Sequence, residues 1–242
     1  MTDAVIEAHK PEREGQIASW LHLLLVLAMV SLGAYRGSAN AASIARAKTF
    51  NHAIFYLLTM AIEWAMLGVV LLGVRLHGTP LSTVLGERWQ SIREVGRDIG
   101  IAVAFLIVSG LVLSLTLGHS SDANPNGIVQ AILPHGPLES ILWIGVSVSA
   151  GICEEAIFRG YLQRQLIALT RSPAVGILLT AVAFGFGHAY KGTVGAMQIV
   201  VFGVLFGILA YWRKSVRPGM IAHTFTDSFA GVMAGILKIK VS

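Results

Sequence analysis

The sequence predicts an all-helical protein that crosses a membrane about seven times (six to eight), with a polar cavity in its C-terminal four helices. Of its 242 residues, 55% are hydrophobic and only 13% are charged, and the mean hydropathy is +0.70. Soluble domains carry roughly 25% charged residues, so lipid must cover much of this surface. Apolar runs near the ~20 residues that cross a bilayer recur along the chain. They lack the alternating polarity of membrane strands.

The charge pattern and the cysteine count limit the partners. The net charge is +5, but the Lys and Arg residues stand mainly between the apolar runs and form no continuous basic face, so no nucleic-acid partner is expected. The single cysteine, Cys153, excludes an intrachain disulfide framework and a cysteine-based zinc site. Its apolar surroundings favour a small buried side chain over a reactive thiol.

Residues 1–137 are predicted to hold a polar tail, three accessory spans and their connectors. The spans are expected at about 17–35, 50–76 and 99–117. No convincing small-residue cleavage site follows the first, so it is interpreted as a retained helix rather than a signal peptide. Residues 77–98 mix acidic and basic side chains and predict a water-facing amphipathic connector. The turn-rich segment 118–137 is expected to be a loop that separates the two halves.

Residues 138–242 are predicted to form the functional core. The spans are expected at about 138–166, 173–190, 193–212 and 217–237. With a cytoplasmic N-terminus, the cytoplasmic connectors hold more Lys and Arg than the opposite side. The sequence therefore predicts a multi-pass protein with its N-terminus in the cytoplasm.

Ionisable side chains within the spans need an explanation, because each costs about 2.5–3.5 kcal/mol or more at the bilayer centre. Glu155 and Arg159 stand four residues apart and can pair on one helix face. Glu154 is rotated by about 100° from Glu155, which leaves its carboxylate free for another task. A structural ion pair would explain Glu155 and Arg159, but it would not explain the second carboxylate.

Two later spans add histidines. Phe184 and His188 share a face of the span 173–190, and His223 and Asp227 form another pair four residues apart. Taken singly, each has an ordinary interpretation: a lone histidine near a helix end is more often structural, and His-x-x-x-Asp is common by chance. Together, on separate apolar helices, the three motifs indicate a functional site.

The segments EEAIFRG at 154–160, FGFGH at 184–188 and HTFTD at 223–227 carry a family resemblance. They are similar to the Glu-Glu-x-x-x-Arg, Phe-x-x-x-His and His-x-x-x-Asn/Asp motifs of the CPBP intramembrane proteases, also called the CAAX-protease and bacteriocin-processing or Abi family. The order, the spacings and the membrane setting match over about residues 139–235. The resemblance implies hydrolysis of a peptide bond inside the bilayer.

The resemblance also implies a role for each motif residue. Glu154 would be the base that activates water, with His188 as its partner. His223 and Asp227 would stabilise the oxyanion or position the scissile carbonyl. Glu155 and Arg159 would brace the site through their ion pair. Amide hydrolysis needs such a base and such a donor, and a carboxylate in a low-dielectric cavity is a stronger base than one in water. The prenyl-protein branch has Asn where this chain has Asp227. An ionised Asp cannot donate to an oxyanion, so a role in orienting His223 is favoured.

Metal dependence is left with two alternatives. Glu154, His188 and His223 could supply the two-His, one-carboxylate set of a catalytic zinc site. The His-Glu-x-x-His signature of helical zinc proteases is absent from the sequence. A metal-independent glutamate mechanism without a cofactor is favoured, on the family resemblance.

Other polar residues in the spans lie outside the motifs. Glu63 is expected to pair with a neighbouring helix or lie at an interface, with lining of the cavity as the alternative. The tryptophans are interpreted mainly as interface anchors.

Two further functions stay open. Buried acids and histidines also carry protons in transporters, although the first half shows no corresponding motif as an inverted repeat would. A non-catalytic scaffold or immunity protein could keep the motifs and bind a partner. For a protease, the expected substrate is a membrane-associated peptide or protein. This expectation fits several substrates: a prenylated C-terminus, a peptide pheromone, a bacteriocin leader or an anti-sigma factor. The expected location is a bacterial-type cell membrane.

Overall fold

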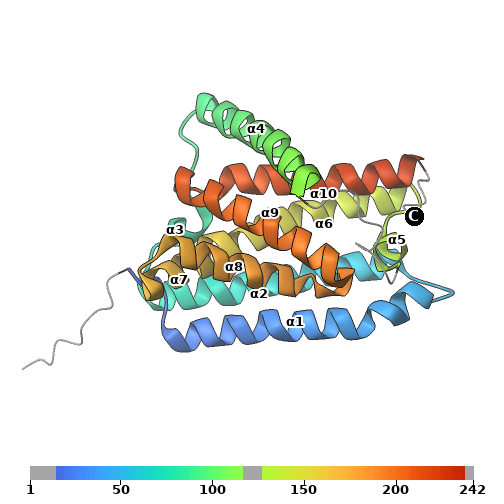
Figure 1. Ribbon diagram of the computed structural model, residues 1–242, viewed down its shortest axis with the longest axis horizontal. Coiled ribbons are helices and arrows are strands. Elements are labelled where there is room, and N and C mark those ends of the chain that lie inside the picture. Colours follow the sequence, from blue (N-terminus) through green and yellow to red (C-terminus); the bar gives the residue numbers. More distant parts are fainter. Residues whose placement is uncertain (1–14, 117–126, 238–242) are drawn as a thin grey trace, which may run out of the picture.

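The structure is a computed structural model that describes residues 15–116 and 127–237, and every regular element in these ranges is a helix (Figure 1). The longer helices are α1 (Trp20–Arg46), α2 (His52–Leu76), α4 (Ile92–Thr116), α6 (Pro137–Glu154), α8 (Pro173–Gly187), α9 (Gly192–Arg213) and α10 (Arg217–Leu237). The shorter elements are α3 (Ser82–Leu85), α5 (Ile128–Ile132), a π-helix (Glu155–Leu162), α7 (Gln163–Thr170) and a 3₁₀ turn (Ala189–Lys191). The predicted all-helical class is confirmed for these residues.

Five helical stretches are long and apolar enough to cross a membrane, namely α1, α2, Ile92–Leu115, Pro137–Thr170 and Ala189–Arg213. Large apolar side chains face outward along them, such as Leu21, Ile62 and Ile107, which are 61%, 66% and 69% exposed. Such a surface suits lipid rather than water. The chain is therefore a multi-pass membrane protein. A count of seven also requires α8 and α10 to cross, and α8 has only 15 residues, so that count stays a prediction.

The connector between α2 and α4 departs from the expected water-facing segment. Helix α4 begins at Ile92, so the last part of 77–98 is already helical. Asp98 is only 3% exposed; Trp89 Nε1 donates to its Oδ2 at 2.9 Å, and Arg213 Nη2 of α9 lies 3.7 Å from its Oδ1. The prediction that 77–98 faces water is therefore wrong for Asp98, because partners from the connector and from α9 stabilise the buried charge. In the predicted loop 118–137, residues 118–126 lie outside the described residues.

Helix α6 packs against both α10 and α2 at the centre of the molecule (Figure 1). A Cβ added to Gly151 would stand 2.9 Å from the backbone nitrogen of Thr224, so only glycine permits this approach of α6 to α10. Cys153 is fully buried, as its apolar surroundings predict. The close packing brings the first motif of α6 against the last motif, on α10.

The predicted span 138–166 is one continuous helix, but it widens into a π-helix over Glu155–Leu162, and all eight residues of that segment are buried. Tyr161 O–H donates to His22 Nδ1 at 2.7 Å, and His22 Nε2–H donates to the Val69 carbonyl at 3.1 Å. These bonds fix the π-helix to α1 and α2. Short π-helical segments occur frequently at functional sites, and this one contains most of the first motif.

Candidate active site

The π-helix carries the buried pair Glu155 and Arg159. Arg159 Nη1 donates to Glu155 Oε1 at 2.9 Å, so the pairing expected from the four-residue spacing forms. The guanidinium carbon lies 4.2 Å from the ring centroid of Phe184 and 5.2 Å from that of Phe206. Aromatic faces attract a desolvated cation. The pair is therefore fixed by its own charges and by rings from α8 and α9.

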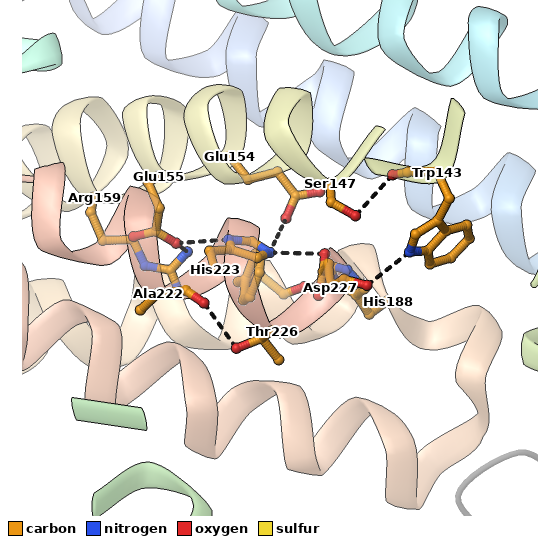
Figure 2. Close-up of polar contacts among 11 residues, drawn as sticks. Trp143, Ser147, Glu154, Glu155, Arg159, His188, Ala222, His223, Thr226 and Asp227 are labelled. Carbon is orange, nitrogen blue, oxygen red and sulfur yellow. Dashed lines mark hydrogen bonds and ion pairs between the residues drawn. The ribbon is translucent and has the colours of Figure 1, made fainter. Parts of the chain in front are cut away.

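His223 of α10 connects this pair to the other carboxylates (Figure 2). Its Nδ1 lies 3.2 Å from Glu155 Oε1, and its Nε2 lies 3.5 Å from Asp227 Oδ2 and 3.7 Å from Glu154 Oε2. Each contact between a ring nitrogen and a carboxylate is attractive only with a proton between the two atoms. We call Glu154, Glu155, Arg159, His223 and Asp227 the His223 cluster.

Glu154 differs from Glu155 in how its charge is held. Glu155 accepts hydrogen bonds from both Arg159 and His223. Within the described residues, the buried Glu154 Oε2 has no hydrogen-bond partner, and its nearest cationic contact is His223 at 3.7 Å. Glu155 Oε2 is also buried without a partner, so the difference is that Glu155 accepts two hydrogen bonds through Oε1, whereas no hydrogen bond to Glu154 is described.

His188 stands just after α8, apart from the direct contacts of the cluster. Its Nδ1 donates to the Phe184 carbonyl at 2.9 Å, which leaves Nε2 of the neutral ring as an acceptor. In the described structure the ion pair of Glu154 is with His223 and not with His188. Figure 2 places His188 beside Asp227, and the two are close enough to interact electrostatically. The structure thus joins five of the six motif residues directly.

Trp143 is a site neighbour that the motifs did not indicate. The sequence suggested an interface anchor, but its Nε1 donates to the Asp227 backbone carbonyl at 2.8 Å (Figure 2). Ser147 Oγ donates to the Trp143 carbonyl at 2.9 Å. Trp143, Ser147 and Glu154 are spaced by four and seven residues, so they share a face of α6. That spacing is the signal that could have found Trp143.

Glu63 lines a cavity beside the cluster, which was the less favoured of the two interpretations from sequence. The cavity has a volume of about 720 Å³, and its wall consists mostly of apolar side chains of α1 and α2. Glu63 of α2 and Tyr190 of the 3₁₀ turn also line it. In the described structure Glu63 Oε2 is buried without a hydrogen bond, and its charge interacts with that of Glu154. Glu63 and Tyr190 are thus cavity-lining residues that are close enough to the His223 cluster to interact with it electrostatically.

The zinc alternative requires the donor atoms of Glu154, His188 and His223 to lie close together. Among the described residues, Glu154, His188 and His223 are not brought together with their donor atoms all within 4.8 Å of one another. The described residues that do meet this condition lie at the start of α2 and of α6 instead. Metal dependence at the His223 cluster therefore stays a prediction, with both the metal-free and the zinc alternative open to test.

The fold and the site define a multi-pass helical membrane protein with a buried cluster of carboxylates, histidine and arginine. Residues 136–229 match a family model described as Type II CAAX prenyl endopeptidase Rce1-like. This segment is therefore similar to Rce1-like domains of the CPBP family, in agreement over these residues with the resemblance stated from the three motifs. The matched segment covers less than half of the chain and contains all six motif residues. No curated protein and no solved structure gives a match.

Proposed function

We propose that this protein is an intramembrane endopeptidase that hydrolyses a peptide bond of a membrane-associated peptide or protein, of the CAAX type or a related one. The observation that carries the proposal is the buried, unbonded Oε2 of Glu154 beside His223, within an Rce1-like domain. Burying a carboxylate that accepts no hydrogen bond costs free energy. A purely structural cluster would therefore not be expected to contain Glu154.

Glu154 is the proposed general base. It takes a proton from water as the water oxygen bonds to the scissile carbonyl carbon. His188 is its proposed partner, because Nε2 of its neutral ring can accept a hydrogen bond from the same water. The proton held by Glu154 then passes to the amine as the carbon–nitrogen bond breaks. General acid–base catalysis of this kind contributes about 10²–10⁴-fold to the rate.

His223 is the proposed donor to the oxyanion, and Asp227 orients it. Nε2 of His223 faces both Glu154 and Asp227, so its proton lies beside the base and near the substrate carbonyl. A donor already in place when negative charge develops lowers the barrier. Glu155 and Arg159 hold the other side of the ring through Nδ1. This arrangement supports a mechanism without metal or other cofactor.

The apolar cavity supports a substrate with an apolar segment. It lies between α1 and α2, so residues 1–137 would supply the accessory helices that receive the substrate and residues 138–242 the catalytic core. Glu63 and Tyr190 mark the side of the cavity nearest the His223 cluster. We further propose seven spans and a cytoplasmic N-terminus, on the distribution of Lys and Arg. A bacterial-type cell membrane is proposed as the location.

A comparison of membrane-proteome peptide termini tests the proposal. Cells that carry the wild-type chain should contain new peptide termini that cells with Glu154→Gln lack, at equal amounts of inserted protein. The purified wild type should then cleave a synthetic peptide spanning such a terminus. Identical termini in both cells, or a phenotype unchanged in both Glu154→Ala and His188→Ala, would leave a binding or scaffold role. Proton uptake without cleavage would indicate a transporter.

A further inference from the structure

A second group of histidines and a carboxylate lies at the other end of α6. His52 begins α2, His135 precedes α6, and Glu139 is in the first turn of α6. Glu139 and Glu154 are fifteen positions apart, which corresponds to about 22 Å of helix at ~1.5 Å per residue. We call His52, His135 and Glu139 the His52 site, which is distinct from the His223 cluster.

The three side chains converge on one point. One donor atom from each lies within 4.8 Å of the other two. His52 Nδ1 is 3.4 Å from Glu139 Oε1, and His135 Nδ1 is 3.9 Å from Glu139 Oε2. The two imidazole rings meet edge to face with centroids 4.9 Å apart. Inward shifts of about an ångström would bring all three donors to the ~2.0–2.2 Å bonds of a zinc ion.

The hydrogen bond of His52 indicates which ring nitrogen carries the proton and why a cation would stabilise the site. Its Nε2 lies 3.0 Å from the Ala131 carbonyl, which only accepts, so Nε2 carries a proton. In the neutral ring, Nδ1 of His52 then presents a lone pair to a carboxylate oxygen of Glu139. Because both atoms are acceptors, they repel each other unless a cation lies between them. Metal-binding histidines typically have this arrangement, with the second N–H held by a backbone carbonyl.

The surrounding contacts hold the ligands in place and leave access. Glu139 Oε2 accepts from the His135 backbone N–H at 2.7 Å, and Tyr56 O–H donates to the Ile132 carbonyl at 2.6 Å, which ties the connector before α6 to α2. The side chain of His52 is 9% exposed and that of His135 is 66% exposed, so the site is fixed on one side and open on the other. A cavity of about 480 Å³, lined by both His52 and Glu139, adjoins it.

We propose that the His52 site binds one divalent transition-metal ion through His52 Nδ1, His135 Nδ1 and Glu139, with water completing the coordination. Two imidazoles and one carboxylate suit Zn²⁺. The ion would join the start of α2 to the start of α6 and so hold the helix that carries Glu154 and Glu155. This proposal does not depend on the proposed protease activity.

The test measures zinc binding to the purified full chain in lipid nanodiscs. Protein stripped with a chelator is titrated with zinc sulfate, and bound zinc is counted after gel filtration. We expect one ion per chain. Glu139→Gln keeps an oxygen that accepts the His135 N–H but loses the charge, and it should weaken binding by at least about tenfold. His135→Ala, at an exposed position, should do the same in a folded protein.

Two matched controls locate the ion. His77→Ala removes another exposed histidine near a helix end, and Glu154→Gln changes the His223 cluster; both should keep one zinc per chain. X-ray absorption should show two imidazole nitrogens at about 2.0–2.1 Å. The proposal is overturned by the absence of bound zinc, which would make His52 a protonated partner of Glu139. It is equally overturned by zinc that survives Glu139→Gln and His135→Ala, or that is lost in Glu154→Gln.

Discussion

The His223 cluster and the His52 site are built from the same kinds of side chain at opposite ends of α6, and they differ in where the positive charge comes from. In the His223 cluster Arg159 neutralises Glu155, and His223 lies among three carboxylates. At the His52 site the described contacts of Glu139 come from histidine rings and a backbone N–H, without Arg or Lys. A cluster that includes its own cation can leave one carboxylate free for proton transfer. One that has none offers its lone pairs to an ion from outside.

The largest expected effect comes from Glu154→Gln, which would separate the two groups. Without the proposed base, cleavage of the peptide found in the terminus comparison should fall by about 10²–10⁴-fold. The protein should remain inserted and folded, because glutamine has nearly the same shape as glutamate. The measurement is kcat on purified protein, with His77→Ala as a control at the wild-type rate. Cleavage that persists in Glu154→Gln would refute the assignment of the base.

Arg159→Ala tests whether the internal cation stabilises the His223 cluster. The substitution leaves Glu155 buried without its main partner, which should cost about 3–5 kcal/mol of stability. We expect a lower yield of folded protein in gel filtration and a lower midpoint of thermal unfolding. The double variant Glu155→Gln/Arg159→Met removes both charges and should recover much of the yield. A normal yield for Arg159→Ala alone would show that the pair is not needed for folding.

Asp227→Asn tests how His223 is oriented. The substitution keeps a polar side chain of the same size but removes the charge 3.5 Å from His223 Nε2. If Asp227 orients His223, kcat should fall about tenfold, equivalent to about 1.4 kcal/mol, with KM nearly unchanged. Steady-state kinetics on the same peptide would measure this. An increase in kcat would instead favour direct donation to the oxyanion by the side chain at 227.

The smallest expected effect on cleavage is that of chelation. It should remove zinc from the His52 site and leave catalysis at the His223 cluster almost unchanged. Exhaustive chelation should take bound zinc from one ion per chain to none, with little change in the initial rate of cleavage. Zinc at 100 times its dissociation constant should add about 2.7 kcal/mol of stability, seen as a higher unfolding temperature. The comparison is repeated in Glu139→Gln, which lacks the proposed zinc ligand of the His52 site. Activity that is lost on chelation and restored only by zinc in this variant as well would contradict the metal-free glutamate mechanism.

Much of the fold was predictable because helices in lipid are marked by hydropathy. The predicted spans at 50–76, 193–212 and 217–237 lie within two residues of α2, α9 and α10. Charged residues near helix ends were harder to place. Asp98 belongs to a helix and is buried, since Trp89 and Arg213 reach it from other elements, and sequence spacing does not encode such contacts.

The site shows the same division between local and long-range contacts. Helical spacing predicted the Glu155–Arg159 pair, because both residues lie on one turn. The contact of His223 with Glu155 spans 68 positions and arises only where α6 meets α10. The role of His188 as the partner of Glu154 comes from the family resemblance and stays a proposal, whereas the ion pair of Glu154 in the described structure is with His223. Trp143 was assigned to an interface because composition does not show which way an indole N–H points.

The π-helix has a consequence for sequence variation within this part of the chain. A π-helix closes its turns with hydrogen bonds five residues apart, one more than in an α-helix. Each π-turn therefore holds about one residue more than an α-turn, and deleting one residue between 155 and 162 would let a regular α-helix form with the helix downstream close to its present direction. The same deletion within α6 or α7, which are already α-helical, would turn everything downstream by about 100°. The side chain of Gln165, which binds the backbone of Ile17 and Ala18, should therefore keep its contacts better after a deletion in the π-helix than after one in α6.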